Sequence, residues 1–223
     1  MIWFPKIKKM YKQTGIILAL VVIMAGCLPK EVEVEADGVI TDSRDGKTYA
    51  YVNIGNQSWL IENMNYTDKD SIGSWCYKGL AKNCDSYGRL YTWDAALKAC
   101  PFGWHLPEDG DWKELEIYLG MDPIEADSTD WRETGNVGIQ LKAVWDWNSG
   151  GTGENISRFT ALPAGIREPN GQYYYIGDIT TFWTSTYTDE AHAVGRAMIY
   201  YSTGVYRWSY LKSGGYSVRC VKD

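Results

Sequence analysis

A short stretch from Cys100 to Trp112 constrains the fold more than any other part of the sequence. It reads C-P-F-G-W-H-L-P-E-D-G-D-W, with a cysteine, two prolines and two tryptophans around one short turn. Proline fixes φ and removes a backbone donor, which excludes regular helix and central strand as far as Pro107. A helix is expected once the chain reaches Asp111, which can cap it, with Glu114 completing a capping box. The residues expected on its core face are Trp112, Leu115 and Leu119.

Composition places the chain among globular proteins rich in aromatic residues. The 223 residues are 45% hydrophobic and 14% aromatic, enough to bury a substantial core. The net charge is −6, and the one dense basic cluster, Lys6, Lys8, Lys9 and Lys12, stands near the N-terminus. This balance argues against a nucleic-acid partner. Eleven Trp and seventeen Tyr supply rings with an apolar body and a polar tip, which suit surface recognition.

The first residues have the pattern of a targeting segment. The basic cluster precedes an apolar run from Gly15 to Ala25, and Met24-Ala25-Gly26-Cys27 closes it with small residues. This pattern resembles a bacterial lipoprotein signal with its lipobox. The run is about half of the roughly 20 residues that a spanning helix needs, so a transmembrane helix is disfavoured. A buried core helix would leave the basic flank and the Ala-Gly-Cys ending unexplained.

We therefore expect residues 1–26 to be a signal peptide that is cleaved before a lipidated Cys27. The acyl chains would give stable membrane anchoring. Leu28 rather than Asp follows the cysteine, which in a Gram-negative cell favours the outer membrane or cell surface over the inner membrane. Residues 27–37 are expected to be an exposed acidic tether. A surface-export signal is the alternative interpretation of that tether.

Four further cysteines remain, Cys76, Cys84, Cys100 and Cys220. An even number in an exported chain predicts disulfides, and three pairings are possible. Cys76 and Cys84 share one loop, so locality favours joining them, and the complement then joins Cys100 to Cys220. A zinc site is the rival use of these residues, but no C-x-x-C occurs and the chain has only two histidines.

Period-two alternation predicts antiparallel sheet over much of the chain. Residues 48–54 and 57–64 flank Gly55-Asn56, which accepts positive φ, and so predict a hairpin. The segment from Asp42 to Gly46 lacks the remaining ligands of a calcium loop and is interpreted as a turn. Thr92 can cap a short helix, and residues 121–153 are expected to be long irregular structure. The further strands are expected at residues 173–176, 182–187, 193–201, 205–211 and 216–221.

Several motifs occur together and in one order: W-L-I-E-N-M, Y-G-R-L-Y-T-W, C-P-F-G-W-H-L-P, A-L-P-A-G-I-R, F-W-T-S-T and S-V-R-C-V. In these the chain resembles the Fibrobacter succinogenes major paralogous domain family over about residues 38–223. The resemblance implies an α+β fold of C-type lectin-like architecture, related to formylglycine-generating-enzyme-like folds. Two short helices and a twisted antiparallel sheet with long loops would be stapled by disulfides, with Cys100–Cys220 as the long bridge. The family is without an assigned activity, so no function follows from it.

No residue set points to catalysis, to a metal or to a cofactor. His105 and His192 lie outside any recognisable nucleophile motif, and G-x-S-x-G and H-E-x-x-H are absent. The formylglycine-generating relatives need reactive cysteines near the C-terminus, whereas Cys220 is expected in a bridge. Glu168-Pro169-Asn170 matches the E-P-N of calcium-dependent lectins, but their companion W-N-D is absent. A hairpin turn explains these three residues, and calcium-dependent sugar binding is the alternative.

The strand at residues 205–211 carries the strongest signal for a binding surface. Alternation places Tyr206, Trp208 and Tyr210 on one face. Rings at alternate positions form a row about 13 Å long at roughly 3.3 Å per residue, which suits two or more sugar rings or a protein partner. Trp183 and Tyr200 are expected as neighbours. The plain alternative is that these rings pack in the core.

These observations predict a surface-anchored bacterial lipoprotein whose domain is a non-catalytic binding module for a glycan or protein ligand. One rival is an enzyme acting on envelope or extracellular polysaccharide. Such an enzyme needs two carboxylates facing a cleft about 5–9.5 Å apart, for example from Glu108, Asp109 and Asp111. A structural envelope protein is the third possibility.

Overall fold

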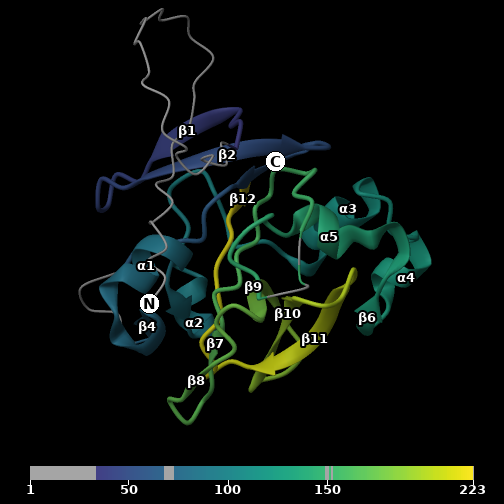
Figure 1. The fold of residues 1–223 in the computed structure, drawn as a ribbon. Coiled ribbons are helices and arrows are strands. Elements are labelled where there is room, and N and C mark those ends of the chain that lie inside the picture. The colour runs from purple at the N-terminus through teal and green to yellow at the C-terminus, as the bar shows by residue number, and fades with distance from the viewer. Residues whose placement is uncertain (1–33, 68–72, 149–150, 152, 223) are drawn as a thin grey trace, which may run out of the picture.

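Two four-stranded antiparallel sheets form the frame of the protein (Figure 1). The computed structural model describes residues 34–67, 73–148, 151 and 153–222. The first sheet has the order β1 (Gly38–Thr41), β2 (Thr48–Ile54), β3 (Gln57–Leu60), β12 (Val221–Lys222). The second sheet has the order β6 (Asp130–Arg132), β11 (Val205–Leu211), β10 (His192–Ile199), β9 (Ile179–Tyr187). Two short ladders pair β4 (Ser74–Trp75) with β5 (Leu90–Tyr91) and β7 (Ile166–Arg167) with β8 (Tyr173–Tyr174).

Short helices lie on two sides of this frame (Figure 1). On the side of β4 are the 3-10 turn η1 (Tyr77–Gly79), α1 (Ala81–Tyr87) and α2 (Trp93–Ala96). On the side of β6 are α3 (Asp109–Tyr118), α4 (Pro123–Asp127), the 3-10 turn η2 (Thr134–Asn136) and α5 (Val137–Leu141). The combination of helices with antiparallel sheets confirms the expected α+β class.

The hairpin that the sequence predicts is present and anchors the first sheet. β2 and β3 pair from Tyr51 opposite Leu60 onward, and Gly55 turns the chain with a φ of 63°. β12 then adds to β3, with Val221 opposite Trp59. The last strand of the described chain therefore lies in the same sheet as the first three.

A cluster of buried rings holds α3 between the two sheets. Trp112 of α3 lies 5.1 Å from Trp59 of β3 and 5.6 Å from Phe182 of β9, measured between ring centroids. Phe159 completes the cluster at 5.8 Å from Phe182. Leu115 is also buried on this face of the helix. The apolar stripe predicted for this helix is therefore core.

Both predicted disulfides are present. Cys76–Cys84 closes a small loop with a sequence separation of 8, and Cys100–Cys220 joins residues separated by 120. The corner that follows Cys100 is also tied to the last strand by backbone hydrogen bonds. His105 and Val221 exchange N–H···O bonds of 3.0 Å in both directions. Covalent and backbone links thus fix the start of α3 to the first sheet.

The start of α3 differs from the prediction. The helix begins at Asp109, with Glu108 as the N-cap in extended conformation, rather than with Asp111 as the cap. The backbone N–H of Glu108 donates to Asp111 Oδ2 at 2.7 Å, so Asp111 is the N3 partner in a capping box. Glu108–Asp111 and Asp111–Glu114 both have the three-residue spacing of a capping box, so the sequence pattern could not decide which pair caps the helix.

Residues 121–153 contain more regular structure than expected. Asp122 caps α4 by accepting the N–H of Ile124 at 2.8 Å, and Pro123 occupies the first helical turn. β6 and α5 follow. Each element is too short to show a period in the sequence, which explains why the prediction missed them.

The predicted strand at 216–221 is also shorter than expected. Only Val221–Lys222 is a strand, and the preceding residues make single bridges, Tyr216 with Tyr91 and Ser217 with Phe182. This segment passes between the two sheets, so its backbone has different partners on successive residues.

The expected tether ends earlier than residue 37. Val34 and Ala36 are buried in the core, and the Asp37 carboxylate pairs with Arg158 at 3.0 Å. Residues 34–37 therefore pack on the domain instead of forming an exposed linker. Cys27 and the proposed signal segment lie outside the described residues.

Candidate functional site

One face of the second sheet combines large rings on β11 with small residues on β10. Tyr206, Trp208 and Tyr210 share a face, as predicted, and their partners across β10 are Ala197, Gly195 and Ala193. A Cβ built on Gly195 would lie 3.0 Å from the Tyr210 ring and 2.9 Å from the Phe182 carbonyl oxygen. The absence of a side chain at Gly195 therefore lets the Tyr210 ring pack directly on β10.

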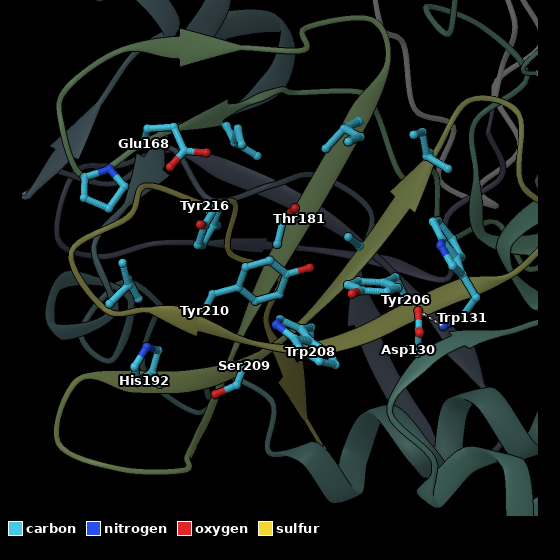
Figure 2. A pocket seen from close by; sticks show the side chains of 16 residues that line it. Asp130, Trp131, Glu168, Thr181, His192, Tyr206, Trp208, Ser209, Tyr210 and Tyr216 are labelled. Atoms are coloured by element: carbon cyan, nitrogen blue, oxygen red, sulfur yellow. Dashed lines mark hydrogen bonds between the residues drawn. The ribbon is translucent and has the colours of Figure 1, made fainter.

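The β11 rings line a cavity of about 560 Å³, which we call the aromatic groove (Figure 2). Its sheet side includes Ile179 and Thr181 of β9, Ala197 and Ile199 of β10 and the three β11 rings. Other lining residues are Asp130 and Trp131 of β6, Ile166 of β7, and Glu168, Pro169 and Tyr216. The volume lies within the range of pockets that take small molecules or short oligomers.

A continuous row of rings crosses two strands along the groove. Trp131, which lies opposite Tyr206 in the sheet register, is 5.1 Å from it between ring centroids. Tyr206 and Trp208 follow at 5.9 Å with an interplanar angle of 25°. Trp208 is 47% exposed and Trp131 is 38% exposed. Large rings left exposed next to one another are typical of a recognition surface rather than of a core.

Tyr210 belongs partly to the core and marks the inner end of the row. Its ring packs edge-on against Tyr216 at 5.1 Å and against Trp183 at 6.4 Å. Burial raises the pKa of the Tyr210 hydroxyl well above its ordinary value. Tyr210 can thus form the base of a site, whereas Tyr206 and Trp208 present the accessible surface.

The two predicted neighbours do not lie in the groove. Trp183 is fully buried, and its indole N–H donates to the carbonyl of Tyr91 at 2.7 Å, so it supports Tyr210 from within the core. Tyr200 follows the end of β10 and packs edge-on against Tyr201 at 5.0 Å. Neither ring is among the lining residues of the groove. The sequence pattern overlooked Trp131 because β6 is only three residues long.

Two carboxylates give the groove its electrostatic character. Neither Asp130 nor Glu168 forms an ion pair within the described part of the chain. Burial, and then the Glu168 charge, raise the pKa of Tyr216; burial and the Asp130 charge raise the pKa of Tyr206. Their charges therefore act on rings that line the cavity.

Positive charge at the groove is scarce. No Lys or Arg occurs among the described residues that line it. His192 is present in the lining, but its Nδ1 lies 2.9 Å from Asp189, which would neutralise a protonated ring. The electrostatic field of the described lining is therefore negative.

The turn at Glu168 is the hairpin predicted from the sequence. The N–H of Gly171 donates to the Glu168 carbonyl, and the N–H of Glu168 donates to the Gln172 carbonyl, both at 2.8 Å. Asn170 Oδ1 accepts the Gln172 N–H at 2.9 Å. Across the residues that the structure describes, no group of three His, Cys, Asp or Glu side chains is placed to hold a metal ion.

The carboxylates considered for catalysis have structural partners. Glu108 and Asp111 form the α3 capping box, and Asp111 also lies 3.3 Å from His105 Nε2. Asp109 pairs with Arg207 at 2.7 Å and Arg196 at 2.8 Å. None of these carboxylates lines the aromatic groove.

The opposite face of the same sheet carries a buried ionic layer. Glu116 of α3 lies 2.5 Å from Arg132 of β6 and 2.8 Å from Arg196 of β10, and all three side chains are fully buried. Burial would raise the pKa of Asp109, but Arg207 and Arg196 outweigh it and hold that pKa well below its usual range. This layer ties α3 to the strands whose other face forms the groove.

Comparison with known proteins assigns the chain to a family. No curated protein and no solved structure matches it. No helix within the described ranges is long and apolar enough to cross a membrane. The family model described as the Fibrobacter succinogenes major domain matches residues 52–222. Because this match covers most of the chain, the protein belongs to the Fibrobacter succinogenes major domain family.

Proposed function

We propose that this protein is a lipid-anchored bacterial surface protein whose domain is a non-catalytic binding module. The ligand is a glycan, with a protein surface as the alternative, and it binds in the aromatic groove. The observation that carries the proposal is the row formed by Trp131, Tyr206 and Trp208, whose outer rings stay exposed beside a cavity. Rings with an apolar face and a polar tip suit stacking on sugars and packing against protein hot spots.

A C-type lectin-like architecture is part of this proposal. It is supported by the last strand joining the sheet of the first strands, and by the Cys100–Cys220 bridge from the helical part to that last strand. The groove also uses the late strands β9, β10 and β11, from which the lectin-like resemblance expects the ligand surface to be built.

The anchor is proposed from the lipobox at Cys27 and would hold the domain at the outer membrane or cell surface. Its test is the substitution Cys27→Ala, which should leave an unlipidated precursor that no longer partitions into detergent. Partitioning equal to that of the wild type would remove the lipid anchor from the proposal and leave the groove unaffected.

A polysaccharide-cleaving enzyme is the rival function. The structural partners of Glu108, Asp109 and Asp111 favour binding without catalysis, because a hydrolase needs such carboxylates free at its cleft. Incubation of the full chain with any glycan that it binds, followed by analysis of product size, separates the two functions. Shortened products that disappear with Glu168→Gln would favour the enzyme.

The binding test is a glycan array and a pull-down with the full chain in detergent. Trp208→Ala should remove binding, because it deletes the most exposed ring of the groove. The matched control is Phe102→Ala, which removes a fully exposed ring outside the groove lining. A ligand retained by Trp208→Ala but lost with Phe102→Ala would place the site elsewhere and refute the proposal.

A further inference from the structure

We infer that the aromatic groove selects a glycan that carries protonated amino groups, such as de-N-acetylated hexosamine residues. This inference rests on the proposed function and narrows its ligand class. It starts from the two carboxylates of the lining, Asp130 and Glu168, and from the lack of Lys and Arg among the described lining residues. A groove of one sign of charge attracts a ligand of the opposite sign and disfavours acidic glycans.

Trp131, Tyr206 and Trp208 have no cation of the described chain above them, in contrast to several other rings of the protein. Elsewhere the chain places its own cations over aromatic rings: Arg44 lies 3.7 Å from the Tyr66 centroid and Arg167 lies 3.7 Å from that of Trp75. Lys212 lies 4.3 Å from the centroid of Trp93. Among the described residues, no such contact involves Trp131, Tyr206 or Trp208. The faces of these rings therefore remain available to a cation from a ligand.

The nearby arginines are held away from the groove by other partners. Arg167, next to Glu168 in the sequence, stacks on Trp75, and Arg207, next to Trp208, binds Asp109 on the opposite face of the sheet. Neither arginine can pair with the groove carboxylates without breaking these contacts. An ammonium group in the groove would meet both carboxylate charge and ring faces, the combination by which proteins bind organic cations.

The backbone around the groove favours a glycan over a basic peptide. β11 is an inner strand, paired with β10 on one side and with β6 at Val205–Arg207 on the other. Over Val205–Arg207, β11 therefore has no free edge to which a peptide could add as a further strand. The ligand instead meets side chains on a sheet face, where ring stacking and carboxylate contacts determine affinity.

The experiment is a calorimetric titration of the full chain with two chito-oligosaccharides of equal length, one fully de-N-acetylated and one fully N-acetylated. The buffer is of low ionic strength, at a pH where the free amines are protonated. We expect the de-N-acetylated oligomer to bind about tenfold more tightly or better, the equivalent of one favourable charge contact. The difference should shrink as salt is added, because exposed charges are screened.

The variants Glu168→Gln and Asp130→Asn should each reduce the ratio of the two affinities, because they remove the charge that the protonated amines would contact. Glu114→Gln is the matched control: it removes the same charge from an exposed position on α3, outside the groove lining. Circular dichroism and melting temperature confirm that each variant is folded.

Three outcomes would overturn the inference. Equal affinities for the two oligosaccharides would refute charge selection and leave glycan binding as the proposed function. A preference that survives in folded Glu168→Gln and Asp130→Asn together would show that these carboxylates do not cause it. Binding of oligolysine with no binding of either sugar would refute both this inference and a glycan ligand.

Discussion

The two faces of the second sheet differ along β11, where one face is buried against α3 and the other leaves large rings exposed. On the inner face, Arg132, Arg196 and Arg207 are paired with Asp109 and Glu116 of α3. On the outer face, the rings that alternate with those arginines line the aromatic groove. Successive side chains of a strand point to opposite faces, so Arg207 binds Asp109 on the inner face while its neighbour Trp208 lines the groove.

Substitutions on the inner face should therefore affect folding, and substitutions on the outer face of β11 should affect binding. On the inner face, removal of one partner would leave a buried charge uncompensated, which destabilises the fold. The outer face of β11 has half-exposed rings, and their removal leaves no buried charge without a partner. The predictions below test this separation.

The largest effect is expected from Glu116→Gln. This change leaves Arg132 and Arg196 buried beside a neutral amide, and it should lower the free energy of unfolding by about 3–5 kcal/mol. Chemical denaturation measures the loss. Glu114→Gln, on the exposed side of the same helix, should be nearly neutral. Equal small losses for both variants would mean that the inner ionic layer contributes little.

The acid limit of stability should depend on Asp109. Its pKa in the folded protein is lowered, so its contribution is present above the unfolded value of about 3.9 and is lost as the pH falls below it. Asp109→Asn should cost about 2 kcal/mol at neutral pH and make the decline below about pH 4 shallower. Melting curves across this pH range test the change. An identical slope in both proteins would contradict this role for Asp109.

Gly195→Ala should affect both stability and ligand binding moderately. The new methyl group would press on the Phe182 carbonyl from one side and on the Tyr210 ring from the other. We expect a loss of about 1–3 kcal/mol in stability, as for other overpacked sites, together with weaker ligand binding. A variant of wild-type stability and affinity would show that the groove does not need a small residue at this position.

The smallest effect on stability is expected from Trp208→Ala. Its ring is nearly half exposed, so we expect a loss in stability below about 1 kcal/mol, together with binding weakened by at least about tenfold. Trp183→Ala, on the buried ring beside it, should instead cost about 3–5 kcal/mol. Denaturation of both variants makes the comparison. Similar losses would mean that Trp208 belongs to the core.

The sequence predicts the parts of this fold that repeat or that carry specific residues. Alternation located β11 with its bounds, and the Gly55-Asn56 pair located the first hairpin. Locality among four cysteines gave both disulfides. The strand, the hairpin and the Cys76–Cys84 loop depend on neighbours in the chain, which a single sequence displays directly, and Cys100–Cys220 followed as the remaining pair.

The rest of the site depends on contacts between distant segments. The row of rings extends to Trp131 only because β6 pairs with β11, and three residues give no readable alternation. Glu168 reaches the groove from the turn between β7 and β8, and Tyr216 from a segment bridged to Tyr91, and both positions follow from the whole fold. The same limit led the prediction to count Trp183 as a surface neighbour, although the structure buries it.

Binding at the outer face of the second sheet is tested most directly by the affinity of three folded proteins for the glycan that binds most tightly on the array. Calorimetry would compare the wild type, Trp208→Ala and Phe102→Ala. We expect Trp208→Ala to weaken binding by at least about tenfold, while Phe102→Ala binds as the wild type does. Wild-type affinity in folded Trp208→Ala would contradict the claim that the outer face of the sheet is the binding site.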